Sequence, residues 1–257
     1  MLDLTKDYDS YLFGLILTDG NLYFNTRNRG RVQIELSYDD KDIIEKIQNH
    51  FCYKSYINTR NRDTNFVKNY KSIIWGCYQQ DFREELVKLG MPKDNKSELA
   101  NIPLTKYNKN AFWRGVIDGD GSIGMTKNDE PFISLVIVSE QLAQSYLIFL
   151  KEEFNIVKIV NRNKRDNVYN ITVKNEDAIN LGNYIYKNST IHMNRKYKKY
   201  LDFKNWKRTK KKINTRTWID EEDEFILNNS IKQSMKILNR TESSIKTRLW
   251  RLKKKIS

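Results

Sequence analysis

Cysteine and histidine are scarce in this sequence, with two of each among 257 residues. Cys52 and Cys77, even together with both histidines, make no zinc-ligand pattern, and we expect their thiols to be reduced. No apolar run approaches the length of a transmembrane helix, and the first residues lack the basic-then-apolar pattern of a signal peptide. These absences predict a cytoplasmic protein, from a phage or bacterial setting or from an organelle, without a membrane partner.

Acidic residues are too few to balance the basic ones. The sequence has 46 lysines and arginines against 32 acids, a net charge of +14 and a pI near 9.5, which favours a polyanionic partner. Residues 195–216 hold eleven basic residues and one acid, and residues 240–257 hold seven and one, whereas residues 1–194 are nearly neutral. The strongest basic footprint therefore lies in the C-terminal quarter.

Two short stretches, 101 residues apart, share one pattern. Residues 11–20 and residues 112–121 are both apolar runs with a glycine midway and Asp-Gly at the end. A small residue follows each glycine by four positions, so both would lie on one face of a helix. Gly14 and Gly115 each cost about 1 kcal/mol inside a helix, and close contact between two helices is a reason to keep them.

If these two helices lie side by side, Asp19 and Asp120 emerge together at their C-terminal ends. Two carboxylates in this position oppose the helix dipoles and repel each other, which favours binding of a divalent cation. A single Asp-Gly after an apolar helix is usually a turn or a helix cap. Two matching copies, each followed by strand-like sequence, favour a shared site.

Residues 12–20 and 113–121 resemble the nine-residue motif of the LAGLIDADG homing endonuclease family. Leu17 departs from the acidic residue that many members carry at its position, whereas Asp118 retains it. The resemblance implies a monomeric, two-motif protein with an α+β fold, in which tandem αββαββα repeats form a saddle of two antiparallel sheets. This saddle would lie across duplex DNA, and each half would cut one strand.

Hydrophobic periodicity along the chain agrees with two such repeats, at residues 1–105 and 106–206. In the first repeat we expect strands at 21–26, 31–38, 53–60 and 72–78, and helices at 40–51 and 80–89. In the second we expect strands at 121–127, 132–139, 157–163 and 168–174, and helices at 141–154 and 176–187. Strand 132–139 follows strand 31–38 by 101 residues, so the duplication extends beyond the motif.

The expected cofactor is Mg²⁺, with Mn²⁺ as a substitute, because Mg²⁺ prefers a few carboxylates and several retained waters. Its ligands would be Asp19 and Asp120, with the carbonyls of Gly20 and Gly121 as helpers. Basic and acidic residues at the periphery of the site would polarise water, contact a phosphate or enter the water network. These peripheral candidates are Lys96, Lys196, Asp39, Asp40 and Glu140.

One face of the second strand in each repeat would read bases, because a two-stranded ribbon fits the major groove. In the first repeat this face and the preceding turn hold Arg27, Arg29, Arg31, Gln33, Glu35 and Ser37; in the second it holds Phe132, Ser134, Val136 and Val138. The second face is more apolar, which predicts contacts to thymine methyl groups or through water, and a long, asymmetric DNA target. The residues expected at hairpin tips, on phosphates, are Arg60, Arg62, Arg162, Lys164 and Arg165.

The C-terminal quarter continues with a basic helix at residues 194–206, a basic linker at 207–216 and a small all-α domain of three helices at 217–257. Its Trp218, the acids 221–223, Arg240-Thr241, Arg248 and Trp250 resemble the Myb/SANT-like helix-turn-helix group. The resemblance implies a last helix that reads DNA, with residues 253–255 on the backbone. The polar members of this helix are Ser243, Ser244, Lys246, Thr247, Arg248 and Arg251.

Three classes of function fit this organisation. The leading hypothesis is a site-specific DNA endonuclease. The second is a nucleic-acid-binding protein on the same scaffold that does not cut, either a transcriptional regulator or an RNA maturase. The third, suggested by the two-module layout, is a structural DNA-bridging protein. Retention of both Asp19 and Asp120 favours the nuclease, because a pure binding protein has no need of two facing carboxylates.

Overall fold

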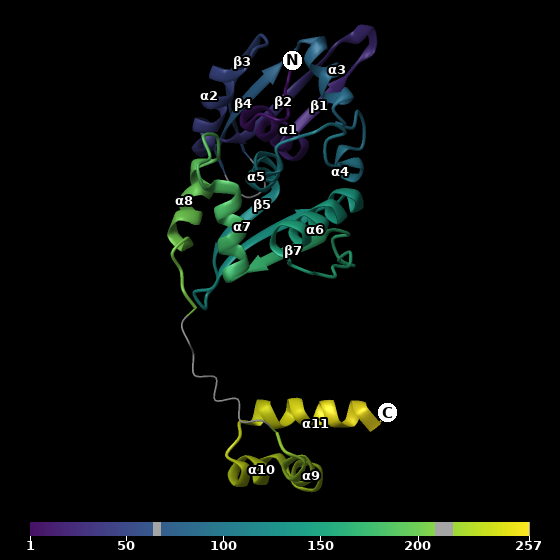
Figure 1. Cartoon of the computed structure of the whole chain (residues 1–257), viewed down its shortest axis with the longest axis vertical. Coiled ribbons are helices and arrows are strands. Elements are labelled where there is room, and N and C mark those ends of the chain that lie inside the picture. Colours follow the sequence, from purple (N-terminus) through teal and green to yellow (C-terminus); the bar gives the residue numbers. More distant parts are fainter. Residues whose placement is uncertain (64–67, 209–217, 257) are drawn as a thin grey trace. The chain divides into compact units, whose positions relative to one another are not determined.

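Two helices that end in Asp-Gly form the centre of the first part of the chain (Figure 1). Helix α1 spans Asp7–Asp19 and helix α5 spans Lys109–Asp120, and each passes directly into a strand. The side chain of Asn108 caps α5 by accepting a hydrogen bond from the amide of Ala111 (3.1 Å). The repeated motif therefore forms the helix pair that its spacing predicts.

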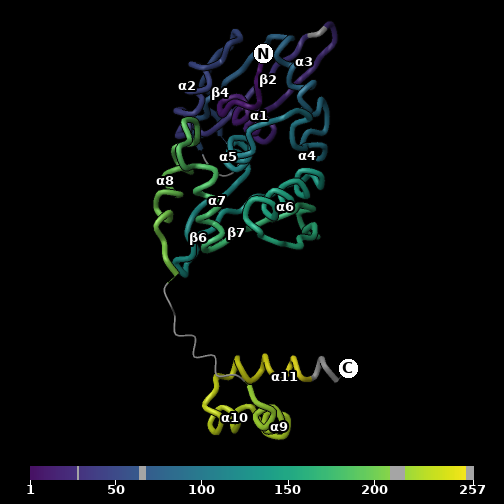
Figure 2. Tube along the Cα trace, viewed as in Figure 1, coloured from purple at the N-terminus to yellow at the C-terminus, as the bar shows by residue number. Residues whose placement is uncertain are grey.

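The computed structural model describes residues 1–63, 68–208 and 218–256 (Figures 1 and 2). The chain divides into two compact units, Met1–Arg208 and Thr209–Ser257. Most of the predicted linker at 207–216 lies outside the described residues. Within the described ranges, no helix is long and apolar enough to cross a membrane.

Helices α1 and α5 approach each other closely enough to leave no room for side chains at two glycines. A Cβ atom on Gly14 would overlap the carbonyl oxygen of Phe112, and one on Gly115 would overlap that of Tyr11. The contact is therefore made by main chain against main chain, as predicted, and a larger residue at either position would push the helices apart.

The first repeat contributes a four-stranded antiparallel sheet with the order β1-β2-β4-β3. Its strands are β1 (Gly20–Phe24), β2 (Gly30–Ser37), β3 (Ser55–Arg62) and β4 (Tyr70–Cys77). Its other helices are α2 (Lys41–His50), α3 (Gln80–Lys88) and the short α4 (Lys96–Leu99), with 3-10 turns at Thr26–Asn28 and Tyr38–Asp40. Each predicted strand and helix of this repeat is present, with bounds shifted by one or two residues.

The second repeat contributes a three-stranded antiparallel sheet with the order β5-β6-β7. Its strands are β5 (Gly121–Met125), β6 (Pro131–Ile137) and β7 (Tyr169–Lys174), and its helices are α6 (Glu140–Phe154), α7 (Glu176–Tyr186) and α8 (Asn194–Phe203). The predicted strand at 157–163 is wrong. Val157 and Ile159 are 71% and 92% exposed, so the apolar alternation that suggested a strand has no sheet or core to pack on.

Strands β2 and β6 each bury one face and leave the other more accessible. On β2 the buried Val32, Ile34 and Leu36 alternate with more exposed polar residues. On β6 the buried Ile133 and Leu135 alternate with the more exposed Phe132, Ser134 and Val136. The buried faces pack on helices, including α1 against β2 and α5 against β6. The opposite faces are free to contact a ligand.

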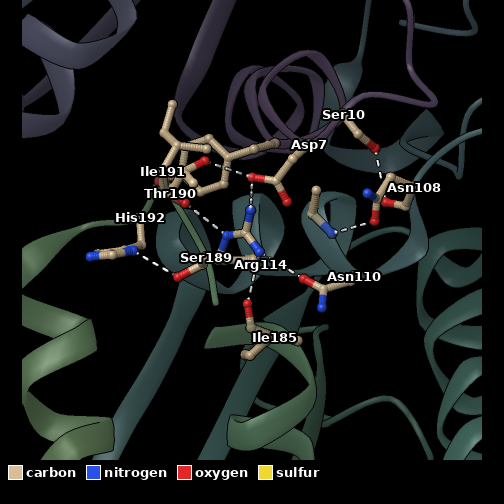
Figure 3. A network of polar contacts seen from close by, with 12 residues as sticks. Asp7, Ser10, Asn108, Asn110, Arg114, Ile185, Ser189, Thr190, Ile191 and His192 are labelled. Carbon is tan, nitrogen blue, oxygen red and sulfur yellow. Dashed lines mark hydrogen bonds and ion pairs between the residues drawn. The ribbon is translucent and has the colours of Figure 1, made fainter. Parts of the chain in front are cut away.

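A buried arginine joins the start of α1 to the end of the second repeat (Figure 3). Arg114 is 1% exposed and donates to the carbonyls of Ile185 and Ile191, at 2.8 Å each. It also donates to the side chain of Asn110 (2.6 Å) and forms an ion pair with Asp7 (2.7 Å). A buried guanidinium requires such partners, because leaving its donors unpaired would cost several kcal/mol.

The C-terminal unit contains α9 (Asp220–Asn228), α10 (Ile231–Leu238) and α11 (Glu242–Ile256), which contact one another. Ile226 and Ile245 are buried between them. The unit therefore has a small apolar core, and the predicted helices at its three positions are present.

Two ion pairs support this small core. Arg240 binds Glu222 (2.6 Å), with both side chains buried, and its guanidinium lies 3.9 Å from the ring centroid of Trp218. Arg248 binds Asp223 (2.5 Å). Arg248, which we predict to contact DNA, thus also neutralises an acid of α9 and supports the fold of the unit.

Candidate active site and nucleic-acid interface

The carboxylates of Asp19 and Asp120 lie together where α1 and α5 end. A Cβ atom added to Gly119, the residue before Asp120, would come within 3.3 Å of Oδ2 of Asp19. Burial, followed by repulsion from Asp120, raises the pKa of Asp19 to about 6. Burial raises the pKa of Asp120 as well. The site therefore holds two carboxylates in surroundings that disfavour the ionised form of each.

A lysine from outside the helix pair binds the end of α1. Lys96 of α4 donates from Nζ to the carbonyls of Ile16 (2.9 Å), Thr18 (2.8 Å) and Gly20. Burial lowers the pKa of Lys96 to about 8, although Asp120 and Asp19 act in the opposite direction. The ammonium group therefore stabilises the negative end of the helix dipole and lies near the carboxylates.

The second repeat contains the same arrangement. Lys196 of α8 donates from Nζ to the carbonyls of Ile117 (2.8 Å), Asp118 and Gly119 (2.9 Å). Burial lowers the pKa of Lys196 too. We predicted that both lysines would lie near the active site, but not that their donors would be directed to the main chain.

The two glycine carbonyls proposed as metal helpers differ in their surroundings. The carbonyl of Gly20 already accepts a hydrogen bond from Lys96, which leaves one lone pair for another contact. Gly121 begins β5 and lies opposite Leu135 in the ladder with β6. Gly20 is therefore the more restricted of the two as a ligand.

Asp118, which precedes Asp120 by two positions in the second motif, lies in the interior and not in the site. It is fully buried and accepts hydrogen bonds from the hydroxyl groups of Tyr11 (2.9 Å) and Tyr186 (2.5 Å) and from the amide of Met193 (2.7 Å). Burial raises its pKa, and the three donors oppose this. Because Met193 precedes α8, Asp118 helps to hold the helix that carries Lys196.

The acids that follow the second strand of each repeat have different environments. Asp40 is buried, and its carboxylate accepts from Nε (3.1 Å) and Nη2 (2.9 Å) of Arg195. Asp39 and Glu140 are exposed. Of the three acids predicted for the water network, one is held in an ion pair between the repeats and two lie at the surface.

The donor set around Asp19 and Asp120 fits a hard divalent cation that retains several waters. A cavity of about 70 Å³ lies beside Asp120, lined also by Thr18 and Ser97, and is large enough to hold water. Within the described ranges, no group of three or more histidines, cysteines or acids could hold a metal ion. A cation held by the two carboxylates would therefore take its remaining ligands from water.

Comparison with known proteins identifies the architecture. Residues 108–214 match the model of a family described as LAGLIDADG-like domain. The solved structure of the LAGLIDADG homing endonuclease I-GzeII in complex with its DNA target is 16% identical, covering 77% of this chain and 88% of that one, with a TM-score of 0.50. The homing endonuclease I-WcaI bound to its DNA recognition sequence is 17% identical, covering 78% and 88%, with a TM-score of 0.54. The chain has the LAGLIDADG homing endonuclease fold.

Two further relatives extend this comparison. I-DmoI in complex with DNA and Ca is 16% identical, covering 71% of this chain and 91% of that one, with a TM-score of 0.50. A DNA polymerase of Methanocaldococcus jannaschii is 30% identical over 148 residues. The match covers 49% of this chain but 8% of the polymerase, so the chain spans less than a tenth of the length of that relative.

On the first sheet of the LAGLIDADG fold, the residues predicted to read bases share the accessible face. Glu35 accepts a hydrogen bond from Ser72 (2.7 Å) and forms an ion pair with Arg62 (3.3 Å), so two of these predicted contacts neutralise each other. Arg27 and Arg29 are exposed in the turn after β1. The same face also carries Arg31, Gln33, Ser37 and Arg60.

On the second sheet, polar groups come from two neighbouring strands. The hydroxyl of Ser134 is hydrogen-bonded to Asn170 (2.9 Å) and to Thr172 (2.8 Å) of β7. Val136 is 42% exposed and lines the cavity beside Asp120. The face is therefore mixed, with an apolar residue next to the carboxylates and hydroxyl groups farther along the strand.

The predicted phosphate contacts of the second repeat lie in or beside a turn, as expected, but this turn does not join two strands of the sheet. Arg162 donates to the carbonyl of Val138 (3.1 Å), and Arg165 forms an ion pair with Asp166 (2.8 Å). Lys164 is exposed. Residues 157–163 form no strand, so these side chains lie in the segment between α6 and β7, in or beside a turn closed by main-chain bonds from Asn163 to Val168 and from Asn167 to Asn163 (2.8 Å each).

Several residues of the two accessible faces were missed. They are Asn21, Tyr23, Tyr56, Asn58, Asn170, Thr172 and Lys174, which lie opposite the predicted strands or one strand beyond them. The alternation of polar and apolar residues in 169–174 was sufficient to identify the last three. Strand β3 is mostly exposed on both sides, so Tyr56 and Asn58 had no such signal.

In the C-terminal unit, the predicted DNA-reading residues other than Arg248 lie on the outside of α11. Lys246, Thr247 and Arg251 are exposed, and Lys246 forms an ion pair with Glu242 (2.6 Å). Ser244 is half-buried near the N-terminus of the helix. The side chains of residues 253–255 lie outside the described part of the structure.

Proposed function

We propose that this chain is a site-specific endonuclease that cuts both strands of duplex DNA, with Mg²⁺ or Mn²⁺ bound between α1 and α5. The observation that carries the proposal is the pair Asp19 and Asp120 on helices that touch through their main chains. A scaffold that only bound DNA would gain nothing from two partly buried carboxylates whose pKa values are raised. The fold, shared with endonucleases solved in complex with DNA, supports the same conclusion.

Hydrolysis of a phosphodiester bond requires an attacking water, neutralisation of the charge that grows on the phosphate oxygens, and a stabilised leaving group. When bound, the divalent cation supplies charge neutralisation and lowers the pKa of its water. Asp19 and Asp120 would hold the cation. Lys96 and Lys196 fix the ends of the two helices, and their positive charge favours ionised carboxylates and approach of a phosphate.

The substrate that fits the accessible faces is a long, asymmetric duplex. The first sheet presents arginine and amide side chains from β2 and β3, whereas the second presents hydroxyl groups and Val136. Base edges in the major groove distinguish such faces, because amide and guanidinium groups read purines and apolar groups contact thymine methyl groups. The basic C-terminal quarter, with a Myb/SANT-like module, would add affinity as a tethered second DNA-binding element acting with a monomeric saddle.

A two-step experiment tests the proposal. Duplexes are first enriched from a randomised pool by repeated rounds of binding in Ca²⁺. The enriched duplexes are then incubated with the full chain in Mg²⁺, Mn²⁺ or EDTA. We expect double-strand cuts that need the metal and disappear in Asp19→Asn and Asp120→Asn, while binding persists. Binding without cutting under any of these conditions would reject the nuclease in favour of a regulator or a maturase.

A further inference from the structure

Arg195 occupies an unusual position between the two repeats. It belongs to α8 in the second repeat, and its Nε and Nη2 donate to both oxygens of Asp40, which follows β2 in the first repeat. Asp40 is buried, whereas the side chain of Arg195 is 51% exposed. Among the described residues, Nη1 has no partner, so the guanidinium is held along one edge and keeps donors free along the other.

Arg195 neighbours the residues that hold the paired carboxylates in place. Arg195 directly precedes Lys196, whose ammonium group binds the end of α5. The charge of Arg195 interacts with those of Asp118 and Asp19, and the charge of Asp40 also acts on Asp19. The ion pair therefore lies at the edge of the site, on the side of Asp19.

The first repeat offers no counterpart to this arginine at the corresponding place. Lys96 corresponds to Lys196, but the residue before it is Asn95, in the left-handed conformation with φ 49°. Gln141 corresponds to Asp40 at the offset of 101 residues, and its amide oxygen is 3.5 Å from the side chain of Asn101. The arrangement of an arginine on a buried acid is thus confined to one side of the helix pair.

We propose that Arg195 binds one of the two scissile phosphates through its free guanidinium edge, with Asp40 as its positioning residue. A guanidinium held along one edge is suited to this role, because it can donate two further hydrogen bonds to phosphate oxygens without reorganising. A group present on one side acts on one strand. The two strands of the target are therefore cut at unequal rates. This inference depends on the endonuclease function proposed above.

The test uses an enriched duplex with a different fluorophore on each strand, cut in Mg²⁺ under single-turnover conditions. We expect Arg195→Gln to slow cleavage of one strand by on the order of tenfold to a hundredfold and to leave the other within about twofold. Asp40→Asn should slow the same strand by less, because the arginine remains but is no longer fixed. The matched control is Arg208→Gln. Arg208 also donates two hydrogen bonds to one carboxylate, that of the exposed Glu176 (2.9 and 2.6 Å). This variant should leave the ratio of the two rates unchanged.

A second readout is independent of cleavage. In Ca²⁺ or EDTA, binding of the duplex by Arg195→Gln should lose about one unit of the slope of log K against log salt, which corresponds to one phosphate contact. If Arg195→Gln does not fold, Arg195→Lys is used instead, because lysine keeps the positive charge beside Asp40 but lacks the free guanidinium edge. Equal slowing of both strands, or no slowing, would overturn the inference. Absence of any cutting by the unchanged chain would instead reject the endonuclease function itself.

Discussion

Replacing Asp19 with asparagine should stabilise the metal-free protein at neutral pH. In the folded chain, burial and the charge of Asp120 raise the pKa of Asp19 from 3.8 to about 6. One pKa unit corresponds to about 1.4 kcal/mol, so the ionised carboxylate costs at most about 3 kcal/mol of folding free energy above pH 6. Solvent screening at this partly exposed position reduces that figure to about 1–2 kcal/mol. Asparagine has the same shape without the charge.

The sign of the pH dependence follows from the raised pKa of Asp19. Between about pH 3.8 and pH 6 the folded state binds the proton that the unfolded state has lost, so wild-type stability falls as the pH rises through this window. Above pH 6 this contribution is constant. The asparagine variant lacks the slope. The difference in stability between the two proteins should therefore be largest near pH 8 and roughly half as large at pH 5.

The assay is urea unfolding in EDTA at pH 5 and pH 8, followed by tryptophan fluorescence, to which Trp75 and Trp113, both buried in the first unit, contribute. The free energy of unfolding of Asp19→Asn should exceed that of the wild type by about 1–2 kcal/mol at pH 8, and its melting temperature by a few degrees. Asp202→Asn, at an exposed position on α8, is the matched control and should change neither value. Equal or lower stability of Asp19→Asn at pH 8 would refute the reasoning.

Further predictions concern the metal, the helix contact and the ion pairs. Excess Mg²⁺ should raise the melting temperature of the wild type but not that of the double variant Asp19→Asn, Asp120→Asn, because only a bound ion stabilises the folded state. Gly115→Ala should lower the free energy of unfolding by about 2 kcal/mol or more, since its methyl group would overlap the main chain of α1, whereas Gly124→Ala, which meets only ordinary contacts, should cost much less. Asp118→Leu should cost about 3 kcal/mol in the same urea assay, because three buried donors lose their acceptor. Arg240→Met should lower the melting temperature of the C-terminal unit alone, since it leaves Glu222 buried without its ion pair, and differential scanning calorimetry would show a loss confined to one transition.

Local patterns predicted most of the fold because the same helix motif and the same strand alternation occur in both halves of the sequence. The spacing of Gly14 and Gly115 predicted the contact between α1 and α5, and the alternation in β2 and β6 predicted which faces are buried. The error at residues 157–163 has a physical cause. A short apolar alternation forms a strand only if a partner strand and a core are available, and neither follows from the local sequence.

The candidate site was predicted in outline, and its electrostatics were not. The motif identified Asp19 and Asp120, and the order of the elements suggested the two lysines. The environment of each acid depends on partners that are distant in the sequence. Asp118 accepts hydrogen bonds from two tyrosines, whereas Asp40 binds an arginine of the opposite repeat, and nothing in the local sequence distinguishes these two aspartates. Such pairings join residues more than sixty positions apart, and no periodicity marks them.

The contact between α1 and α5 through main-chain atoms has a consequence for how the two halves can diverge. Where the two main chains touch, at Gly14 and Gly115, the seam depends on the absence of side chains and not on matched pairs of them. Arg114 and Asp118, which stand where the first half has Phe13 and Leu17, do have partners across the seam, because Arg114 pairs with Asp7 and Asp118 accepts a hydrogen bond from Tyr11. For protein engineering, an exchanged half-molecule would therefore have to preserve the two glycines and these two pairs, while its sheet would carry its own preference for DNA.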